Sequence, residues 1–284
     1  MTMLLRSTVK LASVASALTS MGRLCGLFFL TYHKVDGASG LELDIAAAQF
    51  RRQMAYLAQR MKVVSLDQAL SFLDAGLPLT DDLYVLTFDD GFRDFYTQAF
   101  PILQQHGLPA VLYVNTGFVE TGITYPLEPI GRRDVPVTWG MLAEMADSGL
   151  VTLGAHTHTH PLLVDQPDDR IEEELGLPID LIRRRTGMVA RHFAYPLAVW
   201  DTRTEDLVKR YYASAAIGTG QIAYPGQVDP YRIPRISIRR SDSWRFFQAK
   251  VHGLMEREEV IYSRLKHPAL VNMYKRLLLR GADG

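Results

Sequence analysis

Two adjacent carboxylates at the end of an apolar run are the first feature of this sequence that could do chemistry. Asp89 and Asp90 follow the run LYVLTF at residues 83–88, and Gly91 comes next. The run is short and rich in β-forming residues, which predicts a buried strand. Neighbouring carboxylates at the end of such a strand repel each other and are costly to desolvate. A divalent metal ion held by one of them, with the other left to move protons, would compensate both costs. The alternative is an exposed Asp-Gly turn.

A cluster of histidines is the second such feature. Three of the eight histidines, His156, His158 and His160, fall within five positions directly after another predicted strand. In a continuing strand, His156 and His160 would stand about 13 Å apart, which is too far to share one ion. In a helical or tightly turned segment, residues four apart are about 6 Å from each other and can chelate. Because Gly154 and Pro161 favour a break in the strand, we pair His156 with His160 and expect His158 to point elsewhere.

Together these two features predict a metal site. Two imidazoles and one carboxylate, from His156, His160 and Asp90, form a three-ligand set for Zn²⁺ or a related ion and leave one position open for water. Both features lie at the same end of the predicted sheet, where α/β barrels collect functional side chains. Taken alone, the histidine cluster could also be a polar surface loop.

A third polar group lies at the exit of a later predicted strand. Arg191 comes two residues before Phe193, within the sequence RHFAYP at residues 191–196. An arginine in this place could hold the free aspartate, Asp89, through a bidentate contact. A structural salt bridge in the protein interior is the alternative interpretation.

Short strands alternate with helices along the whole chain. Apolar runs predict strands at residues 26–32, 63–64, 83–88, 110–114, 151–154, 191–196, 213–217 and 233–238. Helical spacing and capping patterns predict helices at residues 50–61, 65–75, 92–107, 138–145, 171–185, 204–211, 244–255 and 261–279. This alternation predicts an α/β fold with a parallel sheet and outer helices, either an open doubly wound sheet or a barrel.

Three local patterns refine this prediction. Ser65 and Gln68 match a capping box, and Gly76 ends the helix that the box begins. Pro101 is expected to kink the helix over residues 92–107. Residues 116–137, which are rich in Gly, Pro and Arg, are predicted to form one long loop.

The composition sets the broad class of the protein. A chain of 284 residues with 48% hydrophobic and 22% charged residues is typical of one large soluble α/β domain. The formal net charge is zero, so no electrostatic argument favours nucleic acid or an anionic surface as a partner. The single cysteine, Cys25, excludes an intramolecular disulfide framework and suits a reducing compartment.

Residues 1–26 are predicted to form a segment of their own. Arg6 and Lys10 flank the start of a short apolar run at residues 11–18, which has the outline of a signal peptide. Arg23 interrupts any longer apolar span, so a transmembrane helix of about 20 residues cannot be drawn. We favour an amphipathic helix that packs on the domain or lies on a membrane surface. A cytoplasmic or membrane-associated protein would follow from this, with export as the alternative.

Beyond these derivations, the motifs resemble those of a known family. TFDDG at residues 87–91, HTHTH at 156–160 and RHFAYP at 191–196 occur in the order typical of the polysaccharide deacetylases, carbohydrate esterase family four. The early YHKV at residues 32–35 is similar to the branch of bacterial biofilm poly-N-acetylglucosamine deacetylases. The resemblance implies that residues 27–284 form a catalytic domain with C-terminal helices. It also implies that this domain is a distorted (β/α) barrel with parallel strands and outer helices.

The resemblance also implies a role for the residues of the main motifs. Asp90, His156 and His160 would bind the metal ion. Asp89 would be the general base, and Arg191 would orient it.

Other positions follow the family less closely. The backbone N–H of Tyr195 would help to hold the oxyanion. His33, at the end of the first predicted strand, fits the place of the general acid in the biofilm branch, and a core histidine bonded to the backbone is the alternative. The late Leu-x-His motif of many members has no convincing counterpart, since only His252 and His267 come late in the chain. Leu197 replaces the glycine that usually follows the Tyr-Pro pair, so we expect a differently shaped substrate groove.

The implied activity is the metal-dependent removal of N-acetyl groups from an amino-sugar polysaccharide or its precursor, which hydrolyses a linear amide bond. Zn²⁺ is the expected ion, with Co, Ni and Mn as alternatives. The expected partners are an N-acetylated glycan and, through the N-terminus, a membrane surface, with no nucleic acid. Two other functions remain open. One is an amidase acting on a lipid-linked sugar or a small molecule, and the other is a catalytically silent carbohydrate-binding barrel.

Overall fold

The computed structural model describes residues 10, 13, 23–122, 134–256 and 258. Most of the predicted N-terminal segment and the whole predicted helix at 261–279 lie outside these residues, so both remain predictions. Among the residues that are described, no helix combines the length and the apolar character needed to cross a bilayer.

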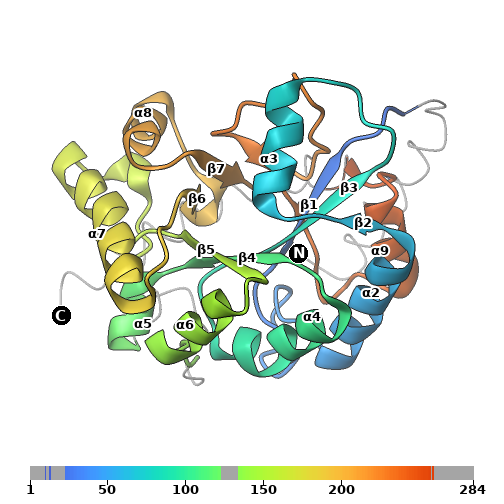
Figure 1. Cartoon of the computed structure of the whole chain (residues 1–284), viewed down its shortest axis with the longest axis horizontal. Coiled ribbons are helices and arrows are strands. Elements are labelled where there is room, and N and C mark those ends of the chain that lie inside the picture. Colours follow the sequence, from blue (N-terminus) through green and yellow to red (C-terminus); the bar gives the residue numbers. More distant parts are fainter. Residues whose placement is uncertain (1–9, 11–12, 14–22, 123–133, 257, 259–284) are drawn as a thin grey trace.

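In the part of the chain that the structure describes, nine strands form one sheet that curves into a nearly closed barrel (Figure 1). Along the sheet the strands follow the order β8-β7-β6-β5-β4-β3-β1-β9, and β2 pairs with β3 beside this path. Each of these pairings is parallel. The predicted barrel of parallel strands is therefore confirmed, and the open sheet is excluded. The strands are β1 (Leu27–Tyr32), β2 (Lys62–Val63), β3 (Leu83–Phe88), β4 (Ala110–Val114), β5 (Val151–Ala155), β6 (His192–Ala194), β7 (Ser214–Ile217), β8 (Ile233–Pro234) and β9 (Ile236–Ser237).

Helices connect the strands, and several of them surround the sheet from outside (Figure 1). Helices α6 and α7 pack against β5, and α2 packs against α4. The structure also describes the short helical turns η1 (Phe95–Ala99), η2 (Leu163–Asp165) and η3 (Pro196–Ala198). The helices are α2 (Ala47–Arg60), α3 (Leu66–Ala75), α4 (Phe100–His106), α5 (Thr116–Thr121), α6 (Trp139–Asp147), α7 (Asp168–Thr186), α8 (Thr202–Tyr211) and α9 (Trp244–Val251).

A single short segment joins the two edges of the barrel. Strand β8 pairs with β7 at one edge, and β9 pairs with β1 at the other. Only Arg235 separates β8 from β9, so the stretch predicted as one strand at 233–238 spans both edges. Arg235 therefore lies at the seam of the barrel, between the strand that pairs with one edge and the strand that pairs with the other.

The capping pattern predicted for α3 is confirmed. The side chain of Ser65 accepts the N–H of Gln68 at 3.2 Å, and the Gln68 side chain accepts the N–H of Ser65 at 3.0 Å. Gly76 ends the helix with a φ of 64°, a left-handed conformation that costs glycine little.

Two helical regions differ from their predictions. Residues 116–121 do not begin a long loop but form α5, because Asn115 caps this helix by accepting the N–H of Phe118 at 2.6 Å. Asparagine is among the best N-cap residues. The helix predicted over residues 92–107 is present as a continuous helical run at residues 93–106, in which the π-helical turn η1 precedes α4. Pro101 lies in the first turn of α4, where its missing N–H is tolerated.

Buried side chains form two layers that alternate along each strand. On β1, Phe28, Leu30 and Tyr32 belong to the larger cluster, whereas Leu27 and Phe29 belong to the second. This alternation follows from the two-residue period of a strand. The second cluster combines residues of β1, β3, β4, β6, β7 and β8 with the buried face of α3. Because these strands lie on different sides of the barrel, the second cluster fills the barrel interior.

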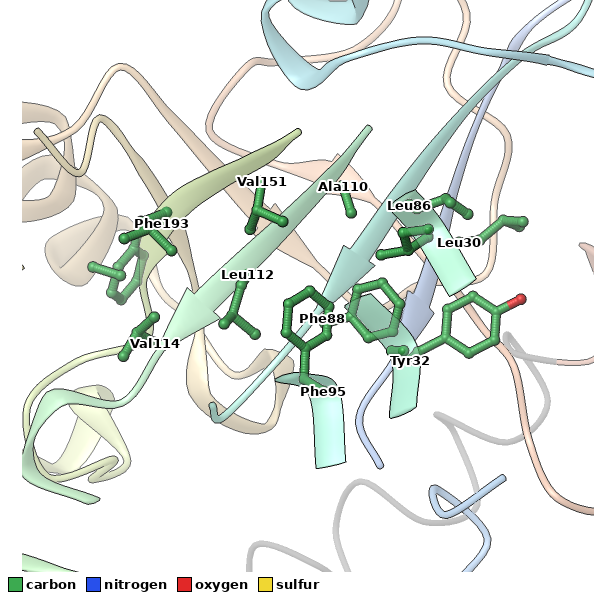
Figure 2. Close-up of a cluster of buried hydrophobic side chains, with 14 of the residues drawn as sticks. Leu30, Tyr32, Leu86, Phe88, Phe95, Ala110, Leu112, Val114, Val151 and Phe193 are labelled. Carbon is green, nitrogen blue, oxygen red and sulfur yellow. The ribbon is translucent and has the colours of Figure 1, made fainter. Parts of the chain in front are cut away.

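The larger cluster lies between the sheet and the outer helices. Figure 2 shows Leu112 of β4 on the same face of the sheet as Phe88 and Tyr32. The ring of Phe88 contacts Tyr32 at a centroid distance of 5.3 Å and Phe95 of η1 at 4.6 Å. These aromatic contacts fix the end of β3 against the turn that follows it.

The carboxyl ends of β1, β3 and β5 lie at one rim of the barrel. This follows from their parallel pairing, in which β3 lies between β1 and β4, and β4 lies beside β5. The residues that directly follow the three strands, His33, Asp89 and His156, therefore share this rim. In (β/α) barrels this rim carries the active site.

Candidate active site

Three predicted metal ligands converge at this rim. Oδ1 of Asp90 lies 3.6 Å from Nε2 of His156 and 3.9 Å from Nε2 of His160. The two Nε2 atoms are 3.1 Å apart. Both histidines are buried, and the Asp90 carboxylate is partly accessible. Elements that are far apart in the sequence thus bring three donor atoms to within 4.8 Å of one another.

Unusual backbone conformations turn the ligands toward one another. Asp90 has a φ of 74°, and Thr157 and His160 have φ values of 60° and 56°. Non-glycine residues adopt this left-handed region at a cost, and such strain clusters at functional sites. Thr157 also ties the turn together, since its hydroxyl donates to the carbonyl of His156 and accepts the N–H of His160 at 2.9 Å.

The protonation of His156 suits a metal ligand. Nδ1 lies 2.8 Å from the carbonyl oxygen of Ala194, which can only accept, so Nδ1 carries the proton and Nε2 presents its lone pair. Burial lowers the pKa of His156 and of His160. Both imidazoles are therefore neutral, which is the form that binds metal ions.

The donor set fits a divalent ion such as Zn²⁺. Nitrogen and oxygen ligands at about 2.0–2.1 Å around a tetrahedral Zn²⁺ are about 3.3 Å from one another. The three distances among Asp90, His156 and His160, between 3.1 and 3.9 Å, lie close to that spacing. Two imidazoles and one carboxylate form a common ligand set for catalytic zinc.

The second aspartate is held by an arginine. Nη1 and Nη2 of Arg235 donate to Oδ1 and Oδ2 of Asp89 at 2.6 and 2.9 Å, a bidentate contact that is buried on both sides. Burial alone would raise the pKa of Asp89, but the guanidinium of Arg235 outweighs it and holds the pKa well below its usual range. Asp89 is therefore an ionised carboxylate of fixed orientation beside the predicted metal ligands.

Comparison with known proteins identifies the family of this domain. Residues 77–215, which include both aspartates and the histidine cluster, match the family model of polysaccharide deacetylases. The chain contains a polysaccharide deacetylase domain. An Escherichia coli protein named poly-beta-1,6-N-acetyl-D-glucosamine N-deacetylase is 32% identical over 138 residues, which are 46% of this chain and 20% of that protein. The chain thus matches about a fifth of the length of this relative.

Other relatives match over most of the chain. A Staphylococcus aureus protein with the same name is 22% identical over 253 residues, covering 81% of this chain and 84% of that protein. The structure of IcaB from Ammonifex degensii superposes with a TM-score of 0.67 at 22% identity, over 81% of this chain and 97% of that one. The Streptococcus pyogenes deacetylase PplD, solved in complex with acetate, gives a TM-score of 0.69 at 21% identity, over 81% of this chain and 99% of that one. At these identities the structural likeness establishes the barrel fold of the deacetylase domain.

The prediction that Arg191 holds Asp89 is wrong. Arg191 is exposed, and the guanidinium that holds Asp89 belongs to Arg235. The reason lies in the closure of the deacetylase barrel, which brings the seam beside β1 and so beside the end of β3. The sequence offered one indication of this role, namely a charged arginine inside the mostly apolar stretch at 233–238.

The prediction that the backbone N–H of Tyr195 helps to hold the oxyanion is also wrong. Its N–H donates to the carbonyl of Ala216 at 3.1 Å as part of the sheet, so it is not free to bind an oxyanion. The same turn contributes in another way, because the carbonyl of Ala194 orients His156. Beyond it, Leu197 and Ala198 have φ values of 54° and 58° in the place where the family usually has glycine.

His33 lies beside Asp89. Its Nε2 is 3.6 Å from Oδ2 of Asp89, and its side chain is 20% exposed. Burial lowers the pKa of His33 to about 4, against the opposing charge of Asp89. The imidazole is therefore neutral near neutral pH, and its role as general acid stays a prediction.

Asp94 connects the loop of His33 to the loop of the two aspartates. Its Oδ1 accepts the N–H of Val35 at 3.0 Å. Burial raises the pKa of Asp94 to about 7. Asp94 was not among the predicted site residues, since nothing in the sequence distinguishes it from a surface carboxylate in the helix that follows β3.

Proposed function

We propose that this chain is a metal-dependent carbohydrate N-deacetylase that hydrolyses the N-acetyl groups of an amino-sugar polymer. The observation that carries the proposal is the convergence of Asp90, His156 and His160 beside the Asp89–Arg235 pair. The match to the polysaccharide deacetylase family supports the reaction class. The names of the E. coli and S. aureus relatives support poly-β-1,6-N-acetyl-D-glucosamine as the first substrate to test.

Asp89 has the properties of a general base for this reaction. A divalent ion held by Asp90, His156 and His160 would act as a Lewis acid toward the amide carbonyl and would lower the pKa of a bound water. Asp89 is ionised, and Arg235 fixes the plane of its carboxylate. It can therefore accept a proton from the attacking water without first changing its own orientation.

His33 is suited to return that proton to the leaving group. The imidazole is neutral at rest, so it can protonate the amine only after it has gained a proton. Its Nε2 lies 3.6 Å from Oδ2 of Asp89, which is the group that takes a proton from water. In this scheme water adds to the carbonyl carbon, the C–N bond breaks, and acetate and a free amine are released.

Acetate release tests the proposed function. Purified protein loaded with Zn²⁺ is expected to release acetate from β-1,6-linked N-acetylglucosamine oligomers, and N-acetylated oligomers with other linkages measure the preference. The chelator-treated protein serves as the control and is expected to recover its activity when Zn²⁺ is added back. Zn²⁺-loaded protein that released no acetate from any N-acetylated glycan would contradict the proposal.

Two variants separate metal binding from proton transfer. Asp90→Ala is expected to abolish both Zn²⁺ binding and hydrolysis, because it removes one of three ligands. Asp89→Asn is expected to keep Zn²⁺ bound while turnover falls by about 10²–10⁴-fold, the usual contribution of a general base. Near-normal turnover of Asp89→Asn would show that another group is the base.

A further inference from the structure

The turn between the two histidine ligands needs partners for its backbone. His156 belongs to the sheet through its N–H, which donates to the carbonyl of Val114 at 2.9 Å, whereas His160 lies four residues later in a left-handed conformation. Between them, the consecutive N–H groups of His158 and Thr159 point away from the sheet ladder. Such neighbouring N–H groups form a small anion-binding concavity. Because their hydrogen bonds are part-buried, leaving either N–H group without a partner would carry a desolvation cost.

A carboxylate of α7 fills this concavity. Oε2 of Glu174 accepts the N–H of His158 at 2.8 Å and the N–H of Thr159 at 2.7 Å. Its Oε1 accepts the hydroxyl of Thr159 at 2.5 Å. Glu174 has no exposed surface, and Nη2 of Arg170, one helical turn earlier, lies 2.8 Å from Oε1 and compensates its charge.

The opposite side of the turn rests on α5. The N–H of Gly117 donates to the carbonyl of His158 at 2.7 Å, and the hydroxyl of Thr116 lies 2.9 Å from Nδ1 of His158. Helices α5 and α7 also contact each other (Figure 1). His158, predicted to point away from the ion, is thus used to attach the turn to α5.

We propose that Glu174 is a positioning residue that preforms the metal site by holding the turn between His156 and His160. This inference rests on the proposed function, in which these histidines bind a metal ion. The bonds to His158 and Thr159 keep the turn closed. In an extended segment, His156 and His160 would be about 13 Å apart, so a turn that opened would separate the two ligands. Partners that orient metal ligands typically change metal affinity by 10–100-fold when they are altered.

The length of the Glu174 side chain, rather than its charge, is expected to decide how much a substitution lowers Zn²⁺ affinity. Glu174→Asp keeps the charge but withdraws the carboxylate by about one C–C bond, or about 1.5 Å, which breaks its bonds to the turn. Its Zn²⁺ affinity is expected to fall at least tenfold. Glu174→Gln keeps the length, and its amide oxygen can still accept both N–H groups. Its affinity is expected to stay within about threefold of wild type. Glu173→Asp is the matched control, because Glu173 also contacts Arg170 but is 56% exposed.

Zn²⁺ affinity is measured by competition with a chromogenic chelator on the full chain, and the visible spectrum of bound Co²⁺ reports the coordination geometry. Equal affinity of Glu174→Asp and wild type would overturn the inference. A loss in Glu174→Gln as large as that in Glu174→Asp would also overturn it, since length would then not matter. A wild-type protein that bound neither ion would instead refute the proposed function.

Hydrogen exchange on the wild-type chain tests the inference even if Glu174→Asp does not fold. In the metal-free protein, the amide hydrogens of His158 and Thr159 are expected to be protected, because Glu174 already binds them. Rapid exchange of both amides without metal, followed by protection on adding Zn²⁺, would mean that the ion forms the turn. That result would overturn the preforming role of Glu174.

Discussion

Arg235 decides the charge of the proposed base. Burial disfavours an ionised carboxylate and by itself would bring the pKa of Asp89 closer to neutrality. Two charge-assisted hydrogen bonds from one planar guanidinium reverse this effect and fix the carboxylate plane. One contact thus supplies both the charge and the orientation that proton transfer from water requires. A lysine could supply the charge, but its single ammonium group could not fix the plane.

Arg235→Gln is expected to destabilise the metal-free protein by about 3–5 kcal/mol at pH 7, because a buried carboxylate then lacks its charged partner. The depressed pKa of Asp89 contributes stability above the unfolded pKa of about 3.9, and this contribution is lost as the pH falls. In the variant, burial without Arg235 would raise the pKa of Asp89, so lowering the pH from 7 to 4 should protonate the buried carboxylate and narrow the deficit. Urea denaturation across this range measures the effect.

The control for this prediction is Arg191→Gln. Arg191 is exposed, so its removal is expected to change stability by less than about 0.5 kcal/mol. The acid limb of the pH–rate profile should move to higher pH in Arg235→Gln alone. If the two variants behaved alike, Arg235 would not be the partner of Asp89 in solution.

Asp94 offers a test with the opposite pH dependence. Burial raises its pKa to about 7, so the folded protein binds this proton more tightly than the unfolded chain does. Its contribution to stability is complete below pH of about 3.9 and is lost as the pH rises through 7. Asp94→Asn keeps the acceptor for the N–H of Val35 but never ionises. The variant is therefore expected to be more stable than wild type by about 1–3 kcal/mol at pH 8 and by little at pH 4.

Chemical denaturation of both proteins at pH 4, 6 and 8 measures this difference. Asp147→Asn is a suitable control, because Asp147 is an exposed carboxylate of α6. A stability difference between Asp94→Asn and wild type that did not change with pH would mean that Asp94 does not titrate in this range.

Residue types and local spacing were enough to predict the three proposed metal ligands. They were not enough to predict which arginine binds Asp89. Asp90, His156 and His160 could be grouped from sequence, because a strand end and a broken strand restrict where their side chains can go. The arginine could not be assigned, because Arg191 and Arg235 both lie near strands. Which of them meets Asp89 depends on how the sheet closes. Glu174 could not be found either, since a carboxylate on an acidic helix resembles its more accessible neighbours Glu172 and Glu173 until the fold buries it.

At the scale of elements, α5 and α7 hold the turn between the histidines from two sides. Gly117 of α5 approaches so closely that an added Cβ would lie 2.4 Å from the carbonyl oxygen of His158. Real Cβ contacts are longer than this, so the turn or the helix would have to move. The close contact between the turn and α5 therefore requires glycine at this position.

Gly117→Ala is expected to weaken Zn²⁺ binding about tenfold or more and to destabilise the fold by about 1–3 kcal/mol, as overpacking usually does. The control is Gly140→Ala in α6, where the nearest atom would be 3.9 Å away. That substitution should leave Zn²⁺ affinity unchanged and stabilise the protein by up to about 1 kcal/mol. Chelator competition and urea denaturation provide the two measurements. Unchanged Zn²⁺ affinity in Gly117→Ala would mean that Zn²⁺ binding does not depend on the contact between the turn and α5.

The elements were easier to predict than their junctions. Strands and most helices follow from periodicity and caps, as α3 illustrates with its Ser65 box. Helix α5 was missed because the Gly and Pro content of residues 116–137 outweighed the single capping signal at Asn115. The division of the last strand around Arg235 could not be foreseen, because it reflects pairing with both edges of the barrel at once.

At the scale of the whole molecule, the proposed metal site forms only in the closed barrel. Asp90 follows β3, whereas His156 and His160 follow β5, with β4 between the two strands. The unfolded chain keeps the two histidines near each other but separates them from the aspartate. An ion that needs all three ligands therefore binds the folded state far better than the unfolded chain, and its binding energy becomes folding stability.

Zn²⁺ is therefore expected to raise the melting temperature of the wild-type chain in proportion to the logarithm of its concentration. At one hundred times the dissociation constant the gain is about 2.7 kcal/mol, or roughly 5–10 °C for a domain of this size. Excess chelator should reverse the shift. Asp90→Ala should remove most of it, whereas Asp147→Ala, which alters an exposed carboxylate of α6, should keep it. A shift of equal size in Asp90→Ala would place the stabilising ion elsewhere, because the two remaining imidazoles do not form a three-ligand site.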